Sequence, residues 1–196
     1  MHSPSLQHLD ILVQLCIYVC STVTWDLCYH FVPELANAAI GSVDFIFYGY
    51  CGSSYADDPD TMCSTGGYFI MLGQNQGAVA SKSFLSKNPA LSSTEAEYIA
   101  LSECAKECAW IKQFIGEIQV FNSTSFEMRE ESSPCINALR IYYHFVRELI
   151  KRRWCSVVKI STSDQTGDLS TKVLPPKTVL RHASNALGHI QGGSRV

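Results

Sequence analysis

A glutamate stands on the predicted apolar face of the clearest helix in this sequence. The stretch LSSTEAEYIAL, which begins at Leu91, opens a pattern that predicts a helix from Ser93 to about Ile118. The apolar stripe advances by steps of three and four residues, and one step of four back from Leu101 falls on Glu97. Glu97 therefore projects from the face that buries the helix. The stripe comprises Leu101, Cys104, Cys108, Ile111, Ile115 and Ile118.

Two roles would account for this acid. Thr94 and Glu97 fit the S/T-x-x-E pattern of a capping box, in which the acid closes the first turn of a helix. Ser92 and Glu95 fit the same pattern less fully. The alternative is that Glu97 does chemistry, and the partners that such chemistry needs must then come from elsewhere in the chain.

The nine cysteines are the other residues with metal-binding chemistry. Cys16 and Cys20 are spaced i,i+4, as are Cys104 and Cys108, and no CxxC motif occurs. A helical pair would hold a metal only if two further ligands converged on it. We therefore predict that the cysteines are small buried core residues in a reducing compartment.

The charges are divided unevenly along the chain. Residues 1–81 contain seven acids and no Lys or Arg, and residues 82–196 contain all 15 basic residues and the other 11 acids. A nucleic-acid surface needs basic side chains to neutralise phosphates. Any nucleic-acid contact must therefore use Lys82, Lys87 and the later basic positions, such as Arg147 and the run Lys151–Arg153.

The order of the expected elements indicates a mixed α/β domain. A short apolar helix near the N-terminus precedes three strands, which are followed by the helix that carries Glu97. A weak region that could hold a short strand at QVFNSTS (119–125), a second long helix, a strand and a last helix complete the chain. The expected helices are 9–23, 93–118, 136–153 and 175–188, and the expected strands are 43–51, 68–73, 77–83 and 155–162.

No apolar run approaches the roughly 18–20 residues that span a bilayer. Ile11–Cys20 resembles the apolar part of a secretory signal, but no Lys or Arg precedes it and no small-residue cleavage site follows. We predict an intracellular protein, cytoplasmic or nuclear, that is neither secreted nor bound to a membrane. Its oligomeric state is left open.

Several motifs resemble the ribonuclease H domain of copia-type retrotransposon Pol polyproteins. They are LSSTEAEYIALSECAKE, YYHFVRELI and VVKISTSDQTGDLSTKVLP, with TGGYFIMLG and AVASKS as further matches to family patterns. The opening MHSPSLQHLDILVQLCIYV resembles the connection segment that precedes that domain, with its basic positions replaced. The resemblance divides the chain into a connection-like helical segment (1–41), a ribonuclease H-like domain (42–190) and a tail (191–196).

The resemblance implies an α/β fold in which helices flank a mixed five-stranded sheet. It also implies an active site of four carboxylates around two Mg²⁺ ions, which cleaves the RNA of an RNA–DNA hybrid. Mg²⁺ prefers oxygen ligands, and carboxylates grouped without a metal repel one another. Metal binding would therefore explain why an acid, Glu97, lies on the buried face of a helix.

Of the four acids that the resemblance requires, two are present. Glu97, the later Glu of STEAEY, and Asp168 in GDLSTK are by resemblance the remaining catalytic and metal-binding residues. Gly52 stands where the first Asp is expected. The third acid, an Asp at the end of strand four, has no counterpart, because no Asp occurs between Asp60 and Asp164. Strand four and the helix after it are accordingly expected to be disrupted within 119–138, which predicts marginal folding or aggregation.

Other acids are the alternatives for the two missing positions. Asp57 and Asp58 lie five and six residues beyond Gly52, up to roughly 15 Å out of register at about 3.3 Å per residue. The candidates for the third position are Glu127, Glu130 and Glu131.

The favoured interpretation is a degenerate copia-type ribonuclease H-like protein that keeps the fold, has lost catalysis and does not bind Mg²⁺ productively. Two alternatives remain open. One is residual cleavage of RNA–DNA hybrids at a relocated site. The other is a co-opted nucleic-acid-binding or interaction protein that uses the basic second half of the chain, with Lys82 and Lys87 among its contacts.

Overall fold

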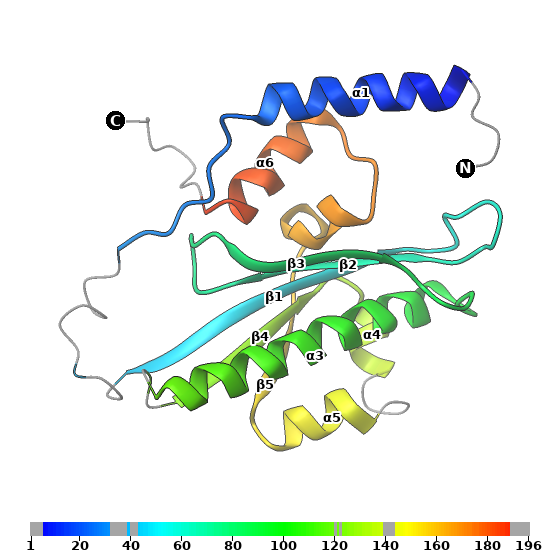
Figure 1. Ribbon diagram of the computed structural model, residues 1–196. Coiled ribbons are helices and arrows are strands. Elements are labelled where there is room, and N and C mark those ends of the chain that lie inside the picture. The colour runs from blue at the N-terminus through cyan, green and yellow to red at the C-terminus, as the bar shows by residue number, and fades with distance from the viewer. Residues whose placement is uncertain are drawn as a thin grey trace.

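A mixed five-stranded sheet forms the centre of the protein (Figure 1). The computed structural model describes residues 6–31, 39, 43–119, 121, 123–138 and 144–188. The strand order is β3-β2-β1-β4-β5: the first three strands pair antiparallel, and β4 pairs parallel with both β1 and β5. The strands are β1 (Asp44–Ser54), β2 (Thr65–Met71), β3 (Ala78–Leu85), β4 (Ser123–Glu130) and β5 (Cys155–Lys159).

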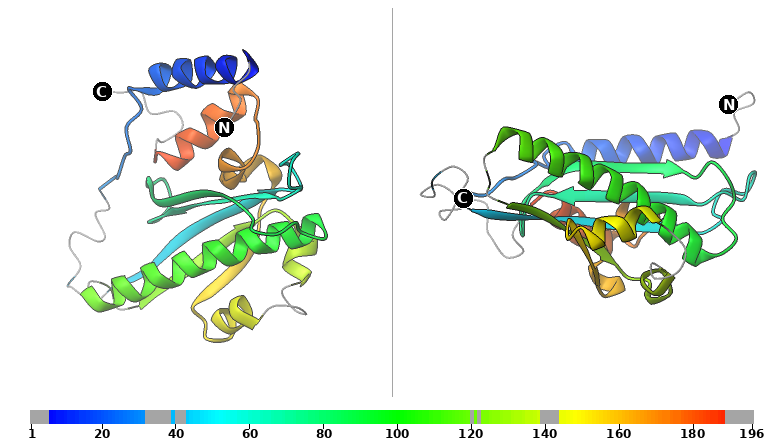
Figure 2. Two further views of the ribbon diagram at one scale, coloured as in Figure 1. Left: turned by 45° about the vertical axis from the view of Figure 1, so that its right-hand side comes forward. Right: turned by 90° about the horizontal axis from the view of Figure 1, so that it is seen from below.

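Helices lie on both faces of this sheet (Figures 1 and 2). The long helix α3 crosses one face, the short helix η2 and α6 lie on the other, and α1 runs beyond α6. The architecture is the α/β arrangement of five strands flanked by helices that the resemblance implied. The helices are α1 (Leu6–Thr22), α3 (Ser93–Ile118), α4 (Ser133–Ala138), α5 (His144–Lys151) and α6 (Pro176–Ala186), with 3-10 helices η1 (Thr162–Asp164) and η2 (Thr166–Ser170).

The core lies between α3 and the sheet. The predicted helix of 93–118 is confirmed in its bounds, and its stripe is buried from Leu101 to Ile115. Ile118, the last stripe residue, is half exposed. Cys104 and Cys108 are fully buried in this core, as predicted. The same prediction is wrong for Cys16 and Cys20, which are exposed on α1.

The fourth strand, expected to be disrupted, is present. β4 has eight residues and pairs with β1 on one side and β5 on the other. Its side chains alternate, so that Phe126 and Met128 are buried in the core and Glu127 and Arg129 lie on the opposite face. The helix that follows, α4, has six residues. The expectation failed because it rested on the missing Asp motif at the end of strand four, whereas the buried face of β4 keeps the alternating apolar residues Phe126 and Met128.

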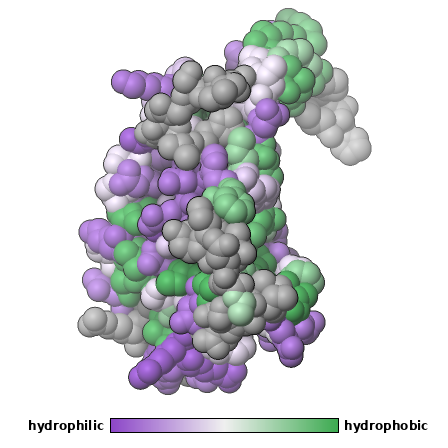
Figure 3. All heavy atoms as spheres, turned by 90° about the vertical axis from the view of Figure 1, so that its left-hand side faces the viewer, coloured by the Kyte–Doolittle hydropathy of each residue, from purple (hydrophilic) through white to green (hydrophobic). Residues whose placement is uncertain are grey.

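The expected helix of 136–153 is only partly seen. α4 ends at Ala138 and α5 begins at His144, and 139–143 lie outside the described residues, as do 1–5 and the tail 191–196. The helix α1 is largely exposed and apolar, and lies at the top of Figure 3. Within the part of the chain that the structure describes, no helix has the length and apolar character needed to cross a membrane.

Candidate functional site

The start of α3 separates the two roles considered for Glu97. The N-cap is Ser92, whose side chain accepts a hydrogen bond from the backbone N–H of Glu95 at 3.2 Å. The Glu95 carboxylate in turn accepts from the backbone N–H of Leu91 at 2.7 Å. The capping pair is therefore Ser92 and Glu95, and the expectation that Glu97 caps the helix is wrong.

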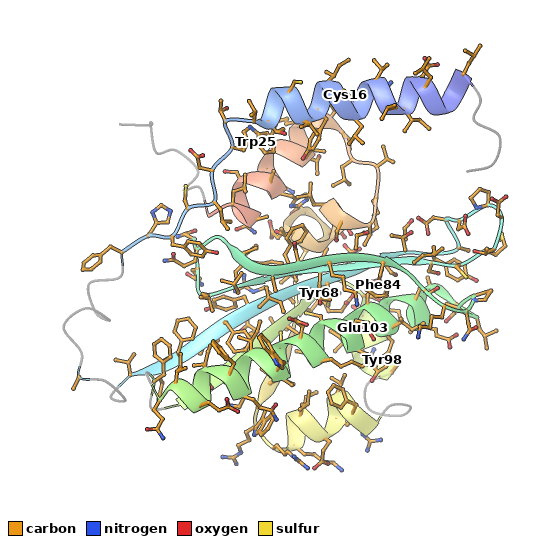
Figure 4. The ribbon with its side chains drawn as sticks, in the orientation of Figure 1. Cys16, Trp25, Tyr68, Phe84, Tyr98 and Glu103 are labelled. Carbon is orange, nitrogen blue, oxygen red and sulfur yellow. The ribbon has the colours of Figure 1, made fainter. Side chains whose placement is uncertain are left out.

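Glu97 lies two residues further along α3 than Glu95 and is buried, as is the next residue, Tyr98, which Figure 4 labels. The side chain is 9% exposed, and its Oε2 atom has no hydrogen-bond partner within the described residues. Burial raises the pKa of this carboxyl to about 7. The nearby Lys172 ammonium and the Ser53 hydroxyl lower this pKa, and the Glu131 and Asp168 carboxylates raise it. Glu97 is thus a buried acid among other acids.

The end of β4 supplies two of those acids. Glu130 is fully buried, and its carboxylate accepts from the backbone N–H of Ser132 at 2.9 Å and from the Cys51 thiol at 3.6 Å. Burial raises the pKa of Glu130 to about 8, and the charge of Glu97 adds to this effect. Glu131 follows directly, with its Oε2 atom buried and without a described hydrogen-bond partner. Glu130 and Glu131 therefore occupy the end of strand four, where the third acid was expected.

The 3-10 helix η2 brings Asp168 to the end of β1. Gly167 makes this possible, because a Cβ added there would lie 2.8 Å from the Cys51 carbonyl carbon and 3.0 Å from the Gly52 nitrogen. The side chain of Gln165 holds η2 in place by accepting from the Gly167 N–H at 3.2 Å. Asp168 is 4% exposed, and burial raises its pKa although Lys172 opposes this.

Lys172 is the cation of the cluster. Its ammonium lies 2.7 Å from Asp168 Oδ1 and 3.3 Å from Glu131 Oε1. Burial alone would lower the pKa of Lys172, but the two carboxylates hold it above its ordinary value. We call Glu97, Glu130, Glu131, Asp168 and Lys172 the carboxylate cluster.

Gly52 adjoins this cluster without contributing to it. A Cβ built on Gly52 would lie 3.2 Å from Asp168 Oδ1, so a side chain at this position would enter the cluster. The position expected for the first acid therefore lies beside Asp168 and carries no carboxylate. Glu97 and Asp168, both predicted from motifs, lie near each other in the structure, whereas Lys172 was given no role. The signal for Lys172 was its spacing of four from Asp168 within GDLSTK.

The remaining alternative acids serve other purposes. Asp57 Oδ1 accepts from the Thr65 backbone N–H at 2.8 Å, and Asp58 binds the Thr61 hydroxyl, so both brace the loop between β1 and β2. Glu127 forms an ion pair of 2.9 Å with Arg129 on the other face of β4. These three residues are held by partners outside the carboxylate cluster.

The cluster does not fit the metal centre that the resemblance implied. Among the described residues, no three His, Cys, Asp or Glu side chains are arranged to hold a metal ion. The ammonium of Lys172 contacts Asp168, the acid that would be needed as a ligand. Glu97 and Asp168 are therefore neighbours in a charge cluster, and we derive no metal-dependent step from them.

The basic residues considered for nucleic-acid binding do not form one surface. Lys82, on the edge strand β3, pairs with Glu103 of α3 at 3.5 Å and lies over the Phe84 ring. Lys87 is exposed just beyond β3. Arg147 lies on α5, beside β5 at the opposite edge of the sheet. Four strand spacings of about 4.8 Å separate the two edges, or roughly 19 Å.

A cavity of about 850 Å³ lies apart from the carboxylate cluster. It is formed by the second half of α3 with the start of β1 and the turn between β2 and β3. Its lining is mainly apolar and aromatic, with Phe45, Trp110 and Phe114 among its residues. The cavity shares no lining residue with the carboxylate cluster, so it is a separate feature from the acids.

The sheet has the strand arrangement that the resemblance implied, with carboxylates at the ends of its strands and a glycine at the position expected for one of them. No family model matches the chain. The chain is 29% identical to the retrovirus-related Pol polyprotein from transposon TNT 1-94 of Nicotiana tabacum, in an alignment that covers 89% of this chain. It is 26% identical to that from transposon RE1 of Arabidopsis thaliana, in an alignment that covers 96% of this chain. The chain is therefore similar in sequence to part of the retrovirus-related Pol polyproteins of transposons.

The chain spans only 13% of the length of each of these polyproteins. It is also 34% identical over 108 residues to the secreted RxLR effector protein 161 of Plasmopara viticola, a match that covers 55% of this chain and 68% of that protein.

Two solved structures are similar. One is the N-terminal ribonuclease H domain of a Mycobacterium tuberculosis protein, with a TM-score of 0.49 and 10% identity over 72% of this chain and 99% of that one. The other is a ribonuclease H1 isolated from compost, with a TM-score of 0.41 and 13% identity over 74% of this chain and 98% of that one. Both TM-scores are under 0.5, so we take the fold from the strand order and pairing instead.

Proposed function

We propose that this chain is a ribonuclease H-like remnant of a Pol polyprotein that no longer cleaves RNA–DNA hybrids. The observation that carries this proposal is Gly52. A side chain at this position would point at Asp168 Oδ1, and glycine supplies no ligand there. Two-metal phosphodiester cleavage needs protein ligands that hold both ions roughly 3.5–4 Å apart. With one position empty and Lys172 bound to Asp168, that ligand set is incomplete.

Residual cleavage is the alternative that one observation favours. Glu130 and Glu131 lie at the end of β4, so the third position is filled by a glutamate where an aspartate was expected. Three carboxylates near Asp168 would then be available to a metal if Lys172 moved away. This alternative therefore has to be tested directly.

The test is a cleavage assay on the purified chain. A hybrid with a labelled RNA strand is incubated with Mg²⁺ or with Mn²⁺, beside the variants Glu97→Gln and Asp168→Asn. We expect the intact strand in every lane. Cleavage by the wild type that both variants abolish would refute the proposal, because contaminating nucleases would be unaffected by these substitutions.

Binding of a hybrid without cleavage is a separate question. Polyanion binding is supported by Lys87 and by the run Lys151–Arg153, which are exposed, whereas Lys82 already pairs with Glu103. We therefore expect weak binding to hybrids that falls steeply with salt. The check is a titration of the protein with hybrid duplex at low and high salt. Lys87→Ala is the variant, and Lys106→Ala, on α3, is the control.

We also propose the division of the chain into the segment 1–41 and the ribonuclease H-like domain 42–190. The start of β1 at Asp44 and the exposure of α1 outside the sheet support this division. An intracellular, reducing location is proposed as well, on the support of nine free cysteines.

A further inference from the structure

Among the described residues, Lys172 provides the ammonium group that forms ion pairs with the acids of the carboxylate cluster. It contacts Asp168 Oδ1 at 2.7 Å and Glu131 Oε1 at 3.3 Å, two carboxylates that come from η2 and from the end of β4. The Asp168 and Glu131 side chains are 6% and 16% exposed. A cation that joins two nearly buried acids from different elements can balance the charge of both.

We propose that the Lys172 ammonium replaces the divalent metal as the counter-ion of this cluster, so that the domain assembles its carboxylates without a metal. This inference rests on the proposed loss of metal-dependent cleavage, since both follow from the state of the same cluster. The inference goes beyond the loss of cleavage, because it assigns a structural role to Lys172, and loss of cleavage alone does not require such a role.

The local backbone fixes Lys172 in this role. The N–H of Lys172 donates to the Asp168 carbonyl at 2.9 Å, so the turn after η2 places the lysine next to the aspartate four residues earlier. Gly52 contributes by its lack of a side chain, because a carboxylate there would stand beside Asp168 Oδ1 and add a charge that one ammonium could not balance.

Two carboxylate oxygens of the cluster lack a partner, which makes the inference testable. Glu97 Oε2 and Glu131 Oε2 are buried and have no hydrogen-bond partner within the described residues. Removal of the ammonium would leave buried carboxylates without a counter-charge, a situation that destabilises proteins strongly. A divalent ion should then bind to the oxygens that lysine had occupied.

The experiment compares wild type with Lys172→Met, which keeps the length of the side chain and removes its charge. Melting is followed at pH 8 in EDTA, in MgCl₂ and in MnCl₂, with NaCl added to equal ionic strength. Lys106→Met is the matched control, since Lys106 pairs with Glu103 on the exposed side of α3. We expect the Tm of Lys172→Met to fall by roughly 5–10 °C in EDTA and to recover in MnCl₂. Wild type and Lys106→Met should show no Mn²⁺ dependence.

A second variant covers the case in which Lys172→Met does not fold. In Lys172→Met with Asp168→Asn one carboxylate charge is removed together with the ammonium, so this double variant should fold and melt closer to wild type. Calorimetric titration of the wild type with Mn²⁺ should give no saturable heat. Saturable Mn²⁺ binding by the wild type, or a Lys172→Met protein as stable as wild type in EDTA, would overturn the proposal.

All of these measurements use the free protein, so they are independent of the cleavage assay. Cleavage of a hybrid by the wild type would refute the proposed inactivity. Mn²⁺ binding by the free wild type would refute the counter-ion role of Lys172.

Discussion

Replacement of Glu97 by glutamine should stabilise the protein at pH 8 and have little effect at pH 5. In the fold, burial raises the pKa of this carboxyl from its ordinary 4.5 to about 7. Between these two values the folded protein keeps the proton while the unfolded chain has lost it. Stability therefore falls as pH rises through this window, and the full penalty is present above about pH 7.

The size of the effect follows from the same two pKa values. A shift of about 2.5 pKa units corresponds to roughly 3 kcal/mol at pH 8, and to under about 1 kcal/mol at pH 5, where the unfolded chain is only partly ionised. Glutamine has nearly the same shape and no charge to bury. Glu97→Gln should therefore gain about 2–3 kcal/mol relative to wild type on going from pH 5 to pH 8.

The measurement is urea unfolding of both proteins at pH 5 and pH 8. Glu117→Gln is the control, because Glu117 is a glutamate of the same helix that is exposed to solvent near its C-terminal end. A gain of Tm of about 5–10 °C at pH 8 should accompany the urea result. A Glu97→Gln protein that is equally or less stable than wild type at pH 8 would refute the argument, because Glu97 would then be held ionised by a favourable partner.

Three further predictions concern the elements that position the cluster. Gly52→Asp places a carboxylate beside Asp168 Oδ1, so its Tm should fall in EDTA and rise with Mn²⁺; an unchanged Tm in both would show that position 52 lies outside the cluster. Gly167→Ala should lower Tm by several degrees, because its Cβ would lie 2.8 Å from backbone of β1, whereas Gly116→Ala, with nothing within 4 Å, should be neutral or stabilising by about 0.5–1 kcal/mol. Ser92→Ala should cost about 1 kcal/mol in urea unfolding through loss of the N-cap, and Thr94→Ala should cost clearly less; the reverse order would restore Thr94 and Glu97 as the capping pair.

Several elements of the fold were predictable from residue patterns within short segments of the sequence. The stripe from Leu101 to Ile115 has strict helical spacing, so the bounds of α3 were predictable. The hairpin strands β2 and β3 were predictable from apolar runs around a turn-forming QNQG. Each of these elements buries one continuous face, so the spacing of its apolar residues is visible in the sequence.

Strand β4 was missed because its stability comes from its neighbours. It lies between β1 and β5, and both edges are paired, so tertiary context overrides a sequence that contains three acids within five positions. The capping assignment failed for a related reason. Two overlapping S/T-x-x-E patterns occur at the start of α3, and only the position at which the chain enters the helix selects Ser92 as the N-cap.

The carboxylate cluster was half predictable. Glu97, Asp168 and the empty position at Gly52 came from motifs, and the structure places all three together. Glu130 and Glu131 depend on the register of β4, and the contact of Lys172 with Glu131 joins residues 41 apart in sequence. Pairings of this kind are set by the fold and cannot be found from spacing alone.

The most direct measurement is a crystal structure of the wild type grown in MnCl₂, with anomalous scattering collected at the manganese edge. We predict that the Lys172 ammonium lies between Asp168 and Glu131, with no anomalous peak at the carboxylate cluster. A manganese ion bound to Asp168 and Glu131, with Lys172 displaced from them, would contradict the account.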